Sequence, residues 1–156
     1  MGGSLGVAVR KAVLDGFRTH LAGLPAFNST AVENEVEVLY AWDFKRQTRQ
    51  RVYGGRSAGT TPPAAMRAGR NHRNETATFQ VNIRVEIPNA TQEEADERLD
   101  EIAVQFEEWV ADRKSNELGA GTTSLKVTSW AGDYFAVDSG AGSIRTYTVS
   151  WSARLT

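Results

Sequence analysis

The sequence contains few side chains of the kinds that bind metals or act as nucleophiles. It has no cysteine and only two histidines, His20 and His72. A zinc site needs several ligands at close spacing, and neither histidine is near a cluster of histidines or carboxylates in the sequence. We therefore expect no metal site, and we expect His20 at the surface or near the end of a helix.

Motifs for acyl or phosphoryl transfer are also missing. No Gly-x-Ser-x-Gly elbow is present to expose a serine nucleophile. The run GAGTTS at 119–124 has the glycines of a phosphate loop but lacks the Gly-Lys-Ser/Thr ending that neutralises phosphates. A link between two elements is the simpler interpretation of this run.

The carboxylates at the start of one predicted helix are the strongest candidates for acid–base chemistry. They are Glu93, Glu94, Asp96 and Glu97. Two carboxylates can act as general acid and base when they flank a substrate. The first turns of a helix, however, favour negative charge through the helix dipole. Because this explains the four residues without catalysis, we predict that the protein is not an enzyme, has no catalytic residues and binds no cofactor.

The segment 44–74 differs in charge and composition from the rest of the chain. It contains no Asp or Glu, is rich in Gly, Pro, Ser and Thr, and holds eight of the chain's 18 basic residues. The remaining sequence has 10 basic and 19 acidic residues, which is a formal charge of −9. The eight candidate interaction residues are Lys45, Arg46, Arg49, Arg51, Arg56, Arg67, Arg70 and Arg73.

Three interpretations of this basic segment stay open. It is a solvated loop, since long loops in compact domains are usually functional or disordered. It contacts nucleic acid by neutralising phosphates, although Tyr53 is the only Phe, Tyr or Trp residue between 45 and 73. Or it is an interface arm that meets an acidic surface. The −9 charge on the rest of the chain makes a second copy a suitable target, so we favour the interface arm.

Apolar residues recurring every three or four positions predict two helices, at 4–22 and 92–114. Ser4 is the expected N-cap of the first. The second follows Thr91, with Glu94 three residues later as in a capping box, and Arg113 and Lys114 at its end suit the dipole. Its expected apolar stripe is Ala95, Leu99, Ile102, Phe106, and Trp109 or Val110.

Alternating apolar residues predict four strands, at 35–43, 76–87, 124–137 and 144–155. The first two strands form a hairpin with the basic segment as an enlarged tip, and residues 50–53 extend its first strand. The run DSGAGS at 138–143 is the expected turn between the last two strands. Ala131-Gly132-Asp133 interrupts the alternation and indicates a bulge or kink. Of the four tryptophans, Trp130 is expected nearest the surface.

These elements predict one α+β domain over residues 1–156: a four-stranded, mostly antiparallel sheet packed against two helices, with a long basic loop between the first two strands. The length fits one domain, and the formal net charge of −1 gives no overall attraction to nucleic acid or acidic membranes. No stretch approaches 18 apolar residues and no secretory signal is visible. We therefore expect no membrane contact and cytoplasm-like conditions.

In the order and texture of its segments, nearly the whole chain resembles the tail-terminator proteins of long-tailed, siphovirus-type bacteriophages, especially those that infect actinobacteria. The similarity includes the leading helix, the strand before the basic segment and the closing hairpin. Between them it lies in VYGGRSAGT at 52–60, AAMRAGR at 64–70, ETATFQVNIRVEI at 75–87 and TQEEADERLDEIAVQFEEWV at 91–110. None of these segments is a signature on its own.

The resemblance implies a structural virion protein that forms a homo-oligomeric ring, a homohexamer, on the head-proximal end of the phage tail. Such a ring caps the tail tube, ends tube polymerisation and joins the tail to the head. The implied partners are further copies of the chain, the tail tube protein, the head–tail connector (stopper) protein and DNA in the lumen, with assembly in the host cytoplasm. Another head–tail connector or tail-tube component stays open as an alternative. So does a small nucleic-acid-binding module that uses the basic loop 45–73.

Overall fold

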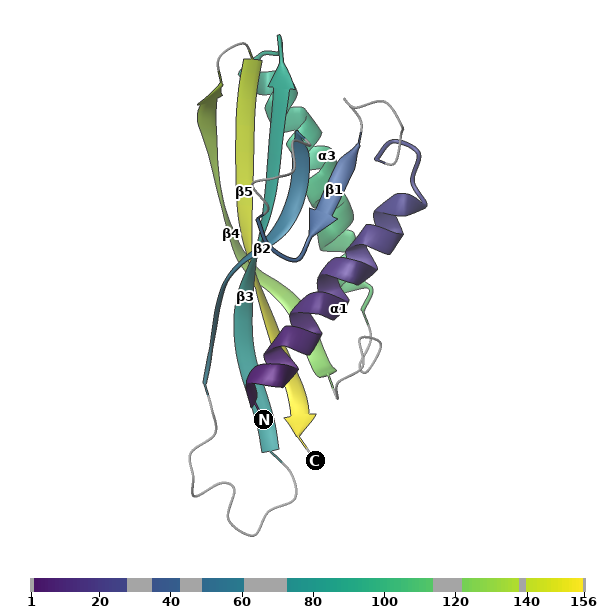
Figure 1. The fold of residues 1–156 in the computed structure, drawn as a ribbon, viewed down its shortest axis with the longest axis vertical. Helices are drawn as coiled ribbons and strands as arrows, with labels where there is room; N and C mark the ends of the chain where they lie inside the picture. The colour runs from purple at the N-terminus through teal and green to yellow at the C-terminus, as the bar shows by residue number, and fades with distance from the viewer. Residues whose placement is uncertain are drawn as a thin grey trace.

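The computed structural model describes residues 2–27, 35–42, 49–60, 73–113, 122–137 and 140–155. The five strands form one sheet, and both helices pack on the same face of it, so this part of the chain has two layers (Figure 1). The α+β class agrees with the prediction. The elements in chain order are α1 (Gly2–Ala22), β1 (Val36–Leu39), β2 (Gln50–Thr60), β3 (Arg73–Pro88), α3 (Gln92–Ala111), β4 (Thr122–Val137) and β5 (Gly140–Leu155).

The sheet has five strands where four were predicted, and its order is β1-β2-β3-β5-β4. β3 pairs antiparallel with β2 and β5, and β5 pairs antiparallel with β4, whereas β1 pairs with β2 in parallel. The predicted hairpin between the first two strands was wrong, because β2 forms inside the basic segment and separates β1 from β3. The prediction of a long loop between the first two strands was wrong for the same reason.

Residues 50–53 were expected to extend the first strand, but β2 was not predicted as a separate strand, because its apolar pattern is short and surrounded by Gly and Arg. Val52 is its fully buried residue and pairs with Ile83 of β3. The neighbours Arg51 and Tyr53 alternate to the opposite face of the sheet. What forms the strand is the ladder to β3, which satisfies the backbone hydrogen bonds of a segment with little apolar content of its own.

β3 is the central strand and carries the strongest sequence signal. Phe79, Val81, Ile83 and Val85 are buried against the helices, and Ile87 is partly buried beside them. This confirms the predicted strand at 76–87, although β3 is longer at its N-terminal end. Asn89 ends the strand with φ 58°, a left-handed conformation that Asn adopts more readily than other residues with a side chain.

α3 confirms the second predicted helix. The Thr91 hydroxyl accepts a hydrogen bond from the Glu94 backbone N–H at 3.2 Å, which is an N-cap contact. The predicted apolar stripe is buried over β3, β4 and β5, together with Ala103. The helix ends at Ala111, so Arg113 lies just beyond it, yet the Arg113 Nε still donates to the Trp109 carbonyl oxygen at 2.9 Å. Lys114 lies outside the described residues.

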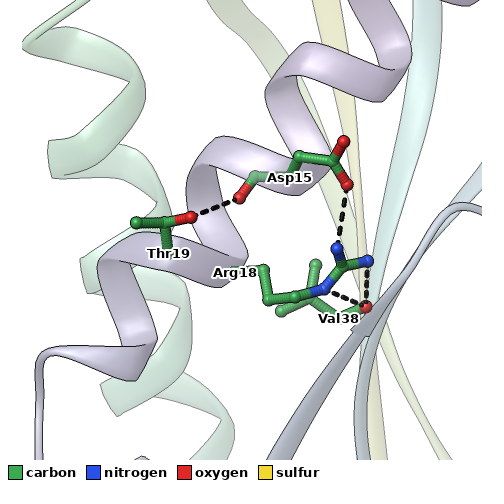
Figure 2. A network of polar contacts seen from close by, with 4 residues as sticks. All are labelled: Asp15, Arg18, Thr19 and Val38. Carbon is green, nitrogen blue, oxygen red and sulfur yellow. Dashed lines mark hydrogen bonds and ion pairs between the residues drawn. The ribbon is translucent and has the colours of Figure 1, made fainter.

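α1 begins at Gly2, so the prediction of Ser4 as its N-cap was wrong: Ser4 lies within the helix. The helix is bound to the outer edge of β1 by Arg18, whose Nε and Nη2 donate to the Val38 carbonyl oxygen at 3.0 and 2.8 Å (Figure 2). The Asp15 carboxylate forms an ion pair with the same guanidinium, with its Oδ1 2.9 Å from Arg18 Nη1. Since the Val36 N–H also donates to the Phe27 carbonyl oxygen at 3.2 Å, the β1 edge of the sheet is capped.

β4 and β5 form a long antiparallel ladder that runs from Val137 opposite Gly140 toward the C-terminus. Gly140 and Gly142 therefore belong to β5, and the prediction that they form a turn was wrong. The predicted bulge at 131–133 was also wrong, because these residues pair regularly with β5; the register shifts lie at 122–124 and 127–129. Gly132 serves packing instead, since a Cβ there would lie 3.3 Å from Trp130 Cζ3.

Within the described residues, neither helix combines the length and the apolar character needed to cross a membrane.

Candidate interaction surface

The eight basic residues predicted to form an interaction arm do not form one continuous loop. β2 divides the segment, so the residues have different surroundings. Four of them lie outside the described residues: Lys45, Arg46, Arg67 and Arg70. The other four are Arg49, which is exposed before β2, Arg51 and Arg56 within β2, and Arg73 at the start of β3.

Arg51, one of the predicted interaction residues, is buried within its own chain. Its side chain is only 5% exposed. Its guanidinium carbon lies 4.5 Å from the centroid of the Trp42 ring, and Trp42 packs edge-on against Tyr53 at 5.1 Å. Alternation along β2 places Arg51 on the sheet face away from the helices, and Trp42 covers it there. Arg51 therefore packs against its own chain.

Arg56 is an exposed cation at an irregular point of β2. The register between β2 and β3 shifts between Gly54 and Ser57, so Arg56 lies in a bulge, and bulges re-aim side chains away from the regular pleat. Arg10 of α1 holds the strand on both sides of Arg56, because its Nη1 donates to the Gly55 carbonyl oxygen at 2.8 Å and to the Ser57 hydroxyl at 3.4 Å. Residues 56–59 are exposed. The backbone at Arg56 is therefore held while its side chain is accessible.

The outer face of α3 has the opposite charge. The helix contains eight acidic residues and one basic residue, Arg98, a formal charge of −7 over 20 positions. The apolar stripe faces the sheet, so the carboxylates point outward, and all eight acidic residues are exposed. They are Glu93, Glu94, Asp96, Glu97, Asp100, Glu101, Glu107 and Glu108. Asp96, at one border of this acidic surface, lies next to residues of β4.

A hollow of about 310 Å³ lies between α3 and β4. Its aromatic walls are Trp130 and Tyr134, which are 58% and 71% exposed. Because they are four residues apart on a strand, they point to the same face, with Gly132 between them. Gly132 has no side chain, and the part of the hollow between the two rings is called the slot; the Trp130 ring lies close to Gly132, because a Cβ there would be 3.3 Å from Trp130 Cζ3. Asp96 of α3 lines the same hollow.

The hollow is electrostatically negative. Its one cation is Arg145 of β5, which is the register partner of Gly132 and whose guanidinium carbon lies 4.4 Å from the centroid of the Trp130 ring. Asp100 and Glu107 of α3 lie 3.6 and 4.0 Å from the Arg145 Nη1. Asp96 lines the same hollow, so three carboxylates of α3 lie in it or beside its one cation. The surface therefore favours a further positive charge.

Tyr147 joins this cluster to the core. It is fully buried, it packs against Phe106 with ring centroids 5.3 Å apart, and its hydroxyl donates to Glu107 Oε2 at 2.5 Å. Burial raises the pKa of the Tyr147 phenol far above its usual value, and the hydrogen bond to Glu107 raises it further. The hydroxyl stays protonated at neutral pH and holds Glu107 beside Arg145.

Of the two histidines considered for catalysis, His20 is the one that the structure describes. His20 lies in the last turn of α1, where its Nε2 is 3.0 Å from Gln105 Oε1 of α3, a contact that links the two helices. His72 lies outside the described residues. In the part of the chain that the structure describes, no three His, Asp or Glu side chains gather closely enough to bind a metal ion.

The chain matches no protein-family model and no curated protein sequence. The assignment of a role therefore depends on the residues themselves and on the surfaces described above.

Sequence reasoning identified part of this surface and missed the rest. The expectation that Trp130 lies near the surface is confirmed. Tyr134 and Arg145 were not singled out, although the spacing Trp130-x-Gly132-x-Tyr134 on a strand was a usable signal, because it places two rings on one face around a glycine. Nothing in the sequence shows that Arg145 lies opposite Gly132, since that depends on the β4–β5 register.

Proposed function

We propose that this protein is a structural, non-enzymatic subunit of a phage tail, a tail terminator that forms a homo-oligomeric ring of six copies. The ring caps the tail tube, ends its polymerisation and joins the tail to the head connector. Its partners are further copies of itself, the tail tube protein and the stopper protein, around a lumen that passes DNA. The resemblance across nearly the whole chain supports this proposal, as does the distribution of charge over the fold.

One observation carries the proposal: the two edges of the sheet are unlike, because the β1 edge is capped and the β4 edge is not paired with another strand among the described residues. β4 ends the strand order, so its outer edge has no strand partner among the described residues, and the aromatic and acidic hollow lies beside it. The exposed Arg56 lies on β2, with β3 and β5 between them. At about 4.8 Å per strand spacing, three spacings separate β2 from β4 by about 14 Å. The opposite charges therefore suit two molecules better than one.

A contact between two unlike surfaces is heterologous, and repeating it produces either a closed ring or an open filament. A tail terminator needs a closed ring with two different faces. The capped β1 edge, where Arg18 and Phe27 occupy the backbone groups of Val38 and Val36, also supports the proposal. It prevents β4 from adding to β1 through backbone hydrogen bonds, and uncontrolled growth of the sheet is thereby avoided.

The test is the absolute mass of the purified protein by light scattering, over a range of concentrations and at low and moderate salt, with electron microscopy of any large species. We expect closed rings of about six copies that dissociate as salt rises, because exposed charge pairs are screened. A strict monomer at every concentration contradicts a self-assembling ring. A monomer that binds duplex DNA with a steep salt dependence would favour the nucleic-acid-binding module instead.

A further inference from the structure

We propose that the slot between Trp130 and Tyr134 is a receptor for the Arg56 side chain of a second copy of this chain. This inference deepens the proposed function and rests on it: it names the contact by which one subunit of the ring binds the next. The occupant is a guanidinium, and the lining of the slot supports that choice.

The slot has the chemistry that recognises a cation. A guanidinium placed over the face of Trp or Tyr is attracted by the negative face of the ring, and the molecule already contains one example, Arg145 over Trp130 at 4.4 Å. Tyr134 is 71% exposed, so its ring is accessible to a partner. Asp96 lines the slot as a carboxylate for charge-assisted hydrogen bonds. Arg suits this site better than Lys, because its planar group stacks and pairs at once.

Arg56 is the described basic residue best placed to enter the slot of another molecule. Arg51 is buried against Trp42, and Arg10 and Arg18 are used in capping backbone carbonyls of the same chain. Arg49 immediately precedes Gln50, which accepts from Arg98 of α3 at 2.7 Å, so Arg49 lies near the acidic helix of its own chain. Arg56 is exposed, lies in a bulge and is further along β2 from that helix.

Arg56 lies on β2 and the slot lies on β4, with β3 and β5 between these two strands. A contact between Arg56 of one molecule and the slot of another therefore joins two different surfaces, which makes it head to tail. A subunit that offers Arg56 to one neighbour keeps its own slot free for the Arg56 of another. The same contact therefore repeats around a ring without using any surface twice.

Cross-linking tests the contact directly, since the chain has no cysteine and every introduced thiol is unique. Ser57→Cys and Ala131→Cys proteins, in which the exposed neighbours of Arg56 and Trp130 are replaced and the contact itself is kept, are mixed and treated with a short bis-maleimide, because an arginine side chain separates the two backbones by more than a disulfide spans. We expect a covalent dimer that needs both variants. The control pairs Ser57→Cys with Glu108→Cys, which lies 12 positions, or about 18 Å, from Asp96 along α3, and should give little product.

Charge exchange provides the second measurement. Sedimentation should show self-association at least tenfold weaker for Arg56→Glu and for Asp96→Arg, and recovery of most of it in the protein carrying both changes. Tyr134→Phe should retain association, because the ring is kept, whereas Tyr134→Ala should lose it. Circular dichroism and thermal unfolding of each variant establish that the fold is intact.

The outcomes separate this inference from the proposed function. Wild-type rings with no Ser57–Ala131 cross-link, and with association unchanged in Arg56→Glu, would overturn the receptor while the ring stands. Cross-links and charge recovery in a protein that forms only open filaments would support the receptor and contradict the terminator. A wild-type protein that neither associates nor cross-links at any concentration would overturn both.

Discussion

Trp130 and Tyr147 lie opposite each other on β4 and β5, on the same face of the sheet, yet one is 58% exposed and the other is fully buried. The positions of the two strands under α3 account for the difference, because the helix contacts β5 most, whereas Trp130 lies on the edge strand β4. The same alternation of side chains therefore produces a core position on one strand and a binding surface on the next. We expect substitutions on the two strands to separate stability from association.

The largest effect is expected at the centre of the covered region. Phe106 is fully buried and contacts both Phe17 of α1 and Tyr147, with ring centroids 5.1 and 5.3 Å away. Phe106→Ala should lower the free energy of unfolding by about 3–5 kcal/mol, because it removes apolar contact and leaves a cavity. Urea unfolding followed by circular dichroism measures this. A loss below about 1 kcal/mol would mean that this region is not the core.

Two glycines beside tryptophan rings make a matched pair. A Cβ on Gly16 would lie 2.5 Å from Trp109 Cζ2, inside the core, and a Cβ on Gly132 would lie 3.3 Å from Trp130 Cζ3, at the surface. Gly16→Ala should cost about 1–3 kcal/mol through overpacking, despite the roughly 1 kcal/mol that Ala gains over Gly in a helix. Gly132→Ala should change stability by less than about 0.5 kcal/mol, since the exposed Trp130 ring can move. Thermal unfolding of both variants decides whether the contrast holds.

The Tyr147 hydroxyl links the covered region to the charged cluster. Tyr147→Phe removes its hydrogen bond to Glu107 and should lower the free energy of unfolding by about 1 kcal/mol at pH 7.

The same variant should show a distinct pH dependence. The folded state raises the pKa of Tyr147 above its ordinary value of 10.0, chiefly through burial. The stabilisation is therefore complete below pH 10 and is lost as the pH rises above it, because the unfolded phenol ionises first. Above pH 10, the free energy of unfolding of the wild type should decrease with pH more steeply than that of the variant, by about 1.4 kcal/mol for each pH unit. Parallel curves between pH 9 and 11.5 would contradict this.

The smallest effect on stability is expected on the uncovered strand. Trp130→Ala should change the free energy of unfolding by no more than about 0.5 kcal/mol, because the ring is mostly in solvent. Its effect on self-association should be large by comparison, and sedimentation equilibrium measures it. Strong destabilisation of the monomer would show that Trp130 acts as a core residue and would remove the contrast with Tyr147.

The sequence by itself determined the elements whose local signals agree with one another. α3 has an N-cap at Thr91, acidic residues in its first turns and an apolar stripe, so propensity, capping and patterning all indicate the same helix. β3 has five apolar residues at alternate positions, which specify both the strand and its buried face. The α+β class followed from these elements and from the periodicity of α1.

The tertiary structure alone decided β2, the parallel pairing with β1 and the composition of the interaction surface. β2 has a weak pattern and forms because β3 supplies a partner for its backbone, and β1 then pairs with β2 and not with β3. Arg51 and Arg56 share one basic segment, but Trp42 buries the first and the bulge exposes the second. The position of α3 over β5 leaves Trp130 and Tyr134 uncovered. Local sequence could not reveal these differences, because each depends on a residue distant in the chain.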